Sequence, residues 1–133
     1  MPSRLLPILG LILGLAACVT PGTRQDELTV TVRTYESTIR WGRIPAAYDF
    51  LRPDVAEGAE IPAGLDQIKV TGYERLTGLI PIDEDKQRFR ATAAIRYVHV
   101  DRQVERSITD EQVWEWDGEA KRWWRTNPIP PFP

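Results

Sequence analysis

The sequence predicts an α+β fold in which two N-terminal helices pack on a curved, four-stranded antiparallel sheet. Apolar residues in the first half of the chain recur at the spacing of one helix face. From Ile68 onward they recur at every second position, which is typical of half-buried strands. Turn residues such as Asp117-Gly118 separate these alternating runs. Helices followed by consecutive strands indicate the α+β class.

The first helix is expected over Arg24–Trp41, closed by Gly42. Its apolar face is formed by Leu28, Val32, Tyr35 and Ile39. A second, short helix is predicted over Ile44–Leu51, because Pro45 fits the first turn of a helix. The segment Asp54–Gly64 is rich in Gly, Pro and Ala and is expected to be a loop, with room for one helical turn.

The alternating runs predict four strands: Gln67–Ile80, Arg88–Val100, Gln103–Trp116 and Lys121–Thr126. A two-residue turn at Asp101-Arg102 sets Phe89 opposite Trp114 and Ile95 opposite Ile108. This register gives the sheet one mainly apolar and one mostly polar face, which cross-strand pairing favours.

A four-residue loop, Asp117–Ala120, would place Trp123 beside Trp114. In that register Trp124 points to the opposite face, near Val113 and Val98, where the three residues form a candidate interface. The residues after Asn127 contain four prolines and are expected to leave the sheet as an extended tail.

Several polar residues fall on the apolar face of the predicted sheet, where burial is costly unless they are paired. We consider Asp110 as a general base, with His99 or Tyr97 as a proton donor. Candidate ligand-binding residues are Arg106, Gln112 and Trp114. The alternative is structural: Asp110 pairs with a helix residue, while Tyr97, His99 and Arg106 cluster near the Asp101 turn.

Composition narrows the classes of function. The formal net charge is −2 and the sequence has no basic arm, which excludes a typical nucleic-acid binder. The single histidine, His99, excludes His-cluster metal sites and the common zinc motifs. No motif for a cofactor is present, so no cofactor is expected. Cys18 is the only cysteine, so a disulfide within the chain is excluded.

The N-terminus has the features of a secretory signal peptide: the basic Arg4, an apolar run over Leu5–Ala17, and small residues before a cleavage point. The ending Leu15-Ala16-Ala17-Cys18 resembles the lipobox of bacterial lipoproteins. The resemblance implies lipidation of the Cys18 sulfur, cleavage before it, and acylation of its new amine with a fatty acid such as palmitate. Because Val19 is not aspartate, similarity to enterobacterial lipoproteins implies sorting to the outer membrane, with the inner membrane as the alternative.

These features divide the chain into a signal peptide (1–17), a lipidated cysteine and tether (18–25), an α+β domain (26–127) and a proline-rich tail (128–133). The tether is short, about 25 Å at most when fully extended. The domain is therefore expected to remain close to its membrane.

The helix, break and second helix over Tyr35–Leu51 are similar to the opening of the nuclear transport factor two-like superfamily, which shares a cystatin-like cone. The strand ending Trp114-Glu115-Trp116-Asp117-Gly118, followed by Trp123, resembles the final hairpin of that superfamily. The resemblance implies a cone with a pocket between helices and sheet. No position matches the catalytic aspartate of the enzymes in the superfamily, so none is transferred.

Three functions follow as expectations. The first is a non-enzymatic, lipid-anchored periplasmic domain that binds a small apolar ligand or a protein partner, either an envelope protein or a second copy of itself. The second is a small isomerase, dehydratase or cyclase that uses Asp110 with His99 or Tyr97. The third is a purely structural envelope subunit with a filled core.

Overall fold

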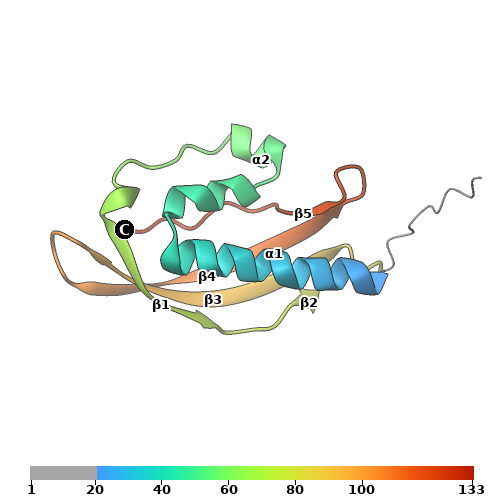
Figure 1. The fold of residues 1–133 in the computed structure, drawn as a ribbon, viewed down its shortest axis with the longest axis horizontal. Helices are drawn as coiled ribbons and strands as arrows, with labels where there is room; N and C mark the ends of the chain where they lie inside the picture. Colours follow the sequence, from blue (N-terminus) through green and yellow to red (C-terminus); the bar gives the residue numbers. More distant parts are fainter. Residues whose placement is uncertain (1–20) are drawn as a thin grey trace, which may run out of the picture.

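The computed structural model describes residues 21–133, so the predicted signal peptide and Cys18 lie outside the described residues. Helical segments come first and strands follow, which confirms the α+β class (Figure 1). The helical segments are α1 (Pro21–Trp41), the 3-10 helix η1 (Ile44–Phe50), α2 (Pro53–Glu57) and the 3-10 helix η2 (Leu65–Gln67). The strands are β1 (Ile68–Arg75), β2 (Ile80–Pro81), β3 (Arg88–His99), β4 (Glu105–Asp117) and β5 (Arg122–Arg125).

The strands form one antiparallel sheet in the order β1-β3-β4-β5, with β2 paired to β3. The sheet curls, and α1 lies along its inner face (Figure 1). Alternate residues of β3 are buried, as period-two patterning requires. The core joins the inner face of the sheet to the apolar face of α1, and includes Leu28, Tyr35, Ile39, Phe89, Ile95, Tyr97 and Trp114.

The predicted pairing of the two long strands is confirmed. Phe89 lies opposite Trp114, and Ile95 lies opposite Ile108. The turn between them is wider than predicted, because the ladder ends at Val98 and Glu105. The His99 carbonyl accepts hydrogen bonds from the N–H groups of Arg102 and Gln103, at 3.0 and 2.9 Å. A two-residue hairpin turn favours glycine or asparagine, and Asp101-Arg102 supplies neither.

The predicted first strand is interrupted. β1 ends at Arg75 and the chain rejoins β3 only at Ile80, as β2. In the intervening loop, the N–H groups of Leu76 and Thr77 both donate to the Thr92 carbonyl, at 2.8 and 3.2 Å. Two consecutive residues that share one partner cannot continue a regular ladder. The edge strand is therefore irregular over residues 76–79, where the Thr92 N–H also donates to the Thr77 hydroxyl at 2.9 Å.

The predicted register of the last hairpin is wrong by two residues. Trp123 lies opposite Trp116, and Trp114 lies opposite Arg125. The Asp117 carboxylate accepts the backbone N–H groups of Glu119 and Ala120, each at 3.0 Å, so the four loop residues start at Gly118 instead of Asp117. As a consequence Trp124 faces Glu115, and not Val113 as predicted.

Both ends of the described range differ from the extended chain that the sequence predicts. Helix α1 begins at Pro21, within the stretch predicted as tether. The C-terminal segment does not leave the body: Ile129 is 7 % exposed, and the Phe132 ring lies 5.1 Å from the Tyr97 ring. Burial of these two apolar side chains is favourable, and the prolines around them have no N–H group to satisfy.

The packed C-terminal segment predicts an unequal cost for two identical substitutions. Ile129→Ala should lower the free energy of unfolding by about 2–4 kcal/mol, because it leaves a cavity in the core. Ile61→Ala, at a residue that is 52 % exposed, should change it by less than about 0.5 kcal/mol. Urea unfolding followed by tryptophan fluorescence measures both, and equal costs would contradict the packing of this segment.

Candidate functional site

A buried ion pair lies at the centre of the molecule. Arg125 of β5 contacts Asp110 of β4 through Nη2 and Oδ1, 2.7 Å apart, and both side chains are completely buried. Asp110 Oδ2 also accepts hydrogen bonds from Arg125 Nη1 at 3.1 Å and from the Tyr35 hydroxyl of α1 at 2.8 Å. The pair therefore ties the last two strands to the helix.

Every donor of Arg125 finds an acceptor in the core or in the C-terminal segment. Nη1 also donates to the Tyr35 hydroxyl at 2.7 Å, and Nη2 donates to the Pro128 carbonyl at 2.8 Å. Nε donates to the carbonyl of Asn127 at 3.1 Å. A buried charge is tolerated where it is paired and fully hydrogen-bonded, as this one is.

Burial and neighbouring charges shift the pKa values of Tyr35 and Arg125. Burial raises the pKa of Tyr35 well above its ordinary value, so the hydroxyl stays protonated. For Arg125, burial alone would lower the pKa, but Tyr35 and the Asp110 carboxylate outweigh it and the net shift is upward. The Arg125 guanidinium therefore remains charged.

A chain of side-chain hydrogen bonds leads outward from the ion pair. Gln112 Nε2 donates to Asp110 Oδ2 at 3.1 Å and to the Tyr73 hydroxyl of β1 at 2.8 Å. Gln112 Oε1 accepts the indole N–H of Trp114 at 3.1 Å. All hydrogen-bonding groups of the amide are thus used, and its orientation is fixed.

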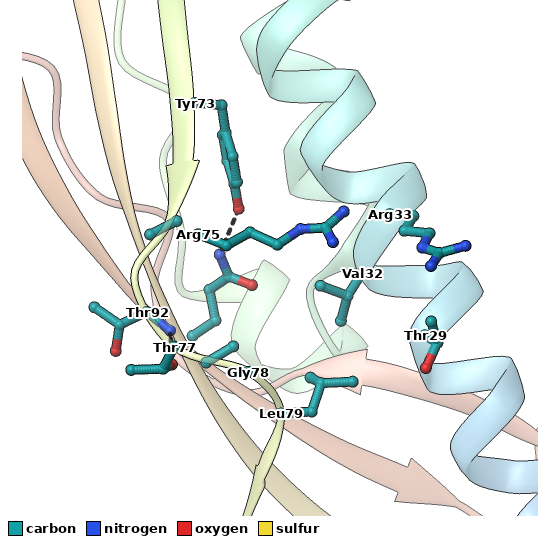
Figure 2. A pocket seen from close by; sticks show the side chains of 12 residues that line it. Thr29, Val32, Arg33, Tyr73, Arg75, Thr77, Gly78, Leu79 and Thr92 are labelled. Carbon is teal, nitrogen blue, oxygen red and sulfur yellow. Dashed lines mark hydrogen bonds between the residues drawn. The ribbon is translucent and has the colours of Figure 1, made fainter.

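Tyr73 and Gln112 also line a cavity of about 170 Å³. The cavity lies between α1 and the segment that joins β1 to β2; Val32 projects into it from α1, and the Tyr73 hydroxyl accepts a hydrogen bond from Gln112 (Figure 2). The lining residues are Thr29, Val32, Arg33, Tyr73, Arg75, Thr77, Gly78, Leu79, Ala91, Thr92, Ala93 and Gln112.

Two sequence features create this cavity. On the inner face of β3, the small residues Ala91 and Ala93 lie between the larger Phe89 and Ile95. Their short side chains form the floor of the cavity and leave space above it. The interruption of the edge strand over residues 76–79 places Thr77, Gly78 and Leu79 in the side wall of the cavity. The exposed residues Arg33, Arg75 and Gly78 border the mouth.

The pKa of Tyr73 supports a hydrogen-bonding role for its hydroxyl. Burial raises the pKa from 10.0 to about 12, although the hydrogen bond from Gln112 acts in the opposite direction. The hydroxyl is therefore protonated and neutral at physiological pH. It is one of the polar groups that line the cavity.

The residues considered for proton transfer lie apart. Asp110 lies opposite Ala93 on β3, and Tyr97 is four residues further along that strand, roughly 13 Å away. The Tyr97 hydroxyl donates to the main-chain oxygen of Pro133 at 2.6 Å, and His99 Nε2 lies 3.2 Å from the same oxygen. The pairing of Asp110 with a helix residue, proposed as the structural alternative, is present in its bond to Tyr35.

The candidate ligand-binding residues divide between different environments. Gln112 lines the cavity, whereas Trp114 is buried behind it and contacts Gln112. Arg106 is exposed on β4, opposite Tyr97.

The candidate interface residues share the outer face of the sheet but do not form one patch. The Arg122 guanidinium stacks over the Trp124 ring, 3.5 Å from the ring centroid. The Trp124 indole N–H donates to the Asp117 carboxylate at 3.1 Å. Val113 lies opposite Arg90, whereas Val98 lies eight residues further along β3, roughly 26 Å away. Val98 is therefore separated from the other two.

Sequence reasoning missed Arg125, Tyr73 and the alanine pair. Arg125 was hidden by the register of the last hairpin, since the predicted loop put Trp123 opposite Trp114. A buried carboxylate on an apolar face requires a partner, and this requirement is a usable signal for the missing arginine. The small residues within the series Phe89, Ala91, Ala93, Ile95 and Tyr97 are a signal for a hollow in the core.

Among residues 21–133, no group of histidine, cysteine or acidic side chains is placed to hold a metal ion. Within the same range, none of the helices has the length and apolar character needed to cross a membrane. No protein-family model, no curated protein and no solved structure matches this chain.

The ion pair predicts a strongly non-additive double-mutant cycle. Arg125→Met leaves a buried carboxylate unpaired and should lower the free energy of unfolding by about 3–5 kcal/mol, with a similar cost for Asp110→Leu. The double variant should cost much less than the sum, because no buried charge remains. Chemical unfolding of the four proteins measures the coupling, and additive costs would show that the pair does not act as a unit.

Proposed function

We propose that this protein is a lipid-anchored periplasmic lipoprotein whose cone-like body binds a small, mainly apolar molecule without transforming it. The cavity beneath α1 is the observation that carries the ligand-binding part of the proposal. An engineered apolar cavity of about 150 Å³ binds benzene, so a volume of about 170 Å³ suits a single ring or a short branched chain.

The neighbouring polar groups favour binding over catalysis. Proton abstraction requires a base with a free lone pair directed at the substrate. Asp110 is completely buried, and both of its oxygens accept hydrogen bonds from within the core. The side chains of Tyr97 and His99 are bonded at the far end of the sheet. Among residues 21–133, the enzyme alternative therefore has no matching base at the cavity.

The cavity also favours binding over a purely structural role. A structural subunit has no need for an open hollow, since each unfilled volume in a core lowers stability. Here two alanines and a break in the edge strand maintain the hollow. A cavity placed between helices and the inner face of the sheet also agrees with the proposed cone.

Support for the lipid anchor comes from the sequence Leu15-Ala16-Ala17-Cys18. Because α1 begins at Pro21, only Val19 and Thr20 separate it from Cys18. Three residues span about 10 Å at most. An anchor on Cys18 would thus hold the body directly at the membrane surface, which we propose is the periplasmic face of the outer membrane, and a cavity there suits a ligand that partitions into lipid.

Filling the cavity should abolish binding. Benzene added to the full-length protein in detergent micelles should shift the NMR methyl signals of Val32 and Leu79, which line the cavity. Ala91→Leu places a larger side chain on the cavity floor and should weaken this binding by more than about ten-fold, since the space is then occupied.

Ala94→Leu is the matched control, because Ala94 is the same residue type on the opposite face of β3. It should bind benzene as the wild-type protein does, and it also corrects for benzene dissolved in the micelles. Wild-type methyl signals that do not move, or that move equally in Ala91→Leu, would overturn the proposed function.

The anchor is tested separately. Cys18→Ser removes the sulfur that the lipid would occupy, so the protein should no longer be matured or carry diacylglycerol, and metabolic labelling with palmitate should fall to background. Mass spectrometry and fractionation of the bacterial envelope measure both effects. Normal maturation and unchanged labelling in the serine variant would refute the anchor.

A further inference from the structure

The fixed orientation of Gln112 determines whether the Tyr73 hydroxyl acts as a donor or as an acceptor toward the cavity. The indole N–H of Trp114 can only donate, so the group facing it must be Gln112 Oε1. Nε2 therefore faces the Asp110 carboxylate and the Tyr73 hydroxyl, and it supplies one hydrogen to each. The Tyr73 oxygen is thus an acceptor in the core.

The hydrogen of the Tyr73 hydroxyl is left for a ligand. Within residues 21–133, no acceptor receives a hydrogen bond from this hydroxyl, while its oxygen is engaged by Gln112. Because the pKa of Tyr73 is about 12, the hydrogen is present at neutral pH. At Tyr73 the cavity therefore offers a donor, and this donor requires an acceptor on the ligand.

The mouth of the cavity adds positive charge. Arg33 of α1 and Arg75 of β1 both line it. Arg75 Nε donates to Glu36 Oε2 at 2.6 Å, so one of the two positive charges is already paired. Arg33 makes no ion pair or hydrogen bond through its side chain with any residue of the described range. Asp110 does not offset this charge, since Arg125 pairs with it.

We infer that the cavity binds a small monocarboxylate with an apolar body, such as an aryl-acetate or a short branched-chain acid. One carboxylate oxygen accepts the Tyr73 hydrogen, and the charge is compensated by the Arg33 guanidinium at the mouth. The apolar body contacts Val32, Leu79 and Ala91, which form the less polar walls. Arg33 follows Val32 on α1; its side chain points away from Val32 in Figure 2, but it is long and exposed and can turn toward the mouth to reach the carboxylate.

This inference rests on the proposed function and specifies its ligand class. A carboxylate and two alternatives to it can be separated with ligands of nearly equal shape. Phenylacetate carries the negative charge, phenylacetamide keeps an acceptor without the charge, and phenethylamine carries a positive charge. Each is titrated into the full-length protein in detergent micelles, with the methyl signals of Val32 and Leu79 as the readout and Ala91→Leu as the correction for micelle uptake.

Phenylacetate should bind about three- to five-fold more tightly than phenylacetamide at low salt, which is the range of a partly exposed ion pair. Phenethylamine should bind most weakly of the three. The advantage of phenylacetate should shrink as salt screens the charge. Arg33→Gln should remove that advantage and leave phenylacetamide binding unchanged, because only the charge is lost.

Arg43→Gln is the matched control, because Arg43 is an exposed arginine that does not line this cavity and the substitution changes the net charge equally. Tyr73→Phe should weaken both phenylacetate and phenylacetamide, but not benzene. Phenylacetate that binds no more tightly than phenylacetamide, or an equal loss in Arg43→Gln, would overturn the inference. If benzene still binds in that case, the proposed function stands without it; if no ligand binds, both fail.

Discussion

The buried pair of Asp110 and Arg125 is the constraint on which the rest of the structure depends. A charge of either sign in an apolar core is unstable alone, so each residue requires the other in one position. Arg125 reaches Asp110 only when β5 pairs with β4 in the observed register. Its remaining donors then bind the carbonyls of Asn127 and Pro128, which directs the C-terminal segment back over the core.

The hydrogen-bond network of this pair ends differently on its two sides. Toward β5, the network ends on main-chain carbonyls and every group is satisfied. Toward β1, it passes through Gln112 to the Tyr73 hydroxyl, where the polar chain reaches the cavity. The inner end of that chain is rigid, because burial and hydrogen bonding leave Gln112 one orientation. The Tyr73 hydroxyl, held by Gln112 beside the cavity, is therefore a preorganised donor. Such a group loses little entropy when it binds a ligand.

The elements that local patterning determines were predictable from the sequence. The helical spacing of Leu28, Tyr35 and Ile39 and the alternation of β3 and β4 gave the correct layers and the correct central register, because a slip by one residue would expose the apolar face. The last hairpin was not predictable in this way. A slip by two residues keeps every side chain on its face, so alternation cannot distinguish Trp123 from Arg125 opposite Trp114.

The cavity could not be predicted from the same signals, because it depends on what is missing from the core. Periodicity reports which residues face inward and does not report whether their volumes fill the space between layers. Ala91 and Ala93 satisfy the inward pattern as well as leucine would, yet they leave room that α1 does not fill. The break at residues 76–79 is likewise a tertiary feature, fixed by the bonds of Leu76 and Thr77 to Thr92. Two sequence features therefore indicate the candidate site in a chain of this class. One is a buried carboxylate without an evident partner, and the other is a pair of small residues within an otherwise bulky strand.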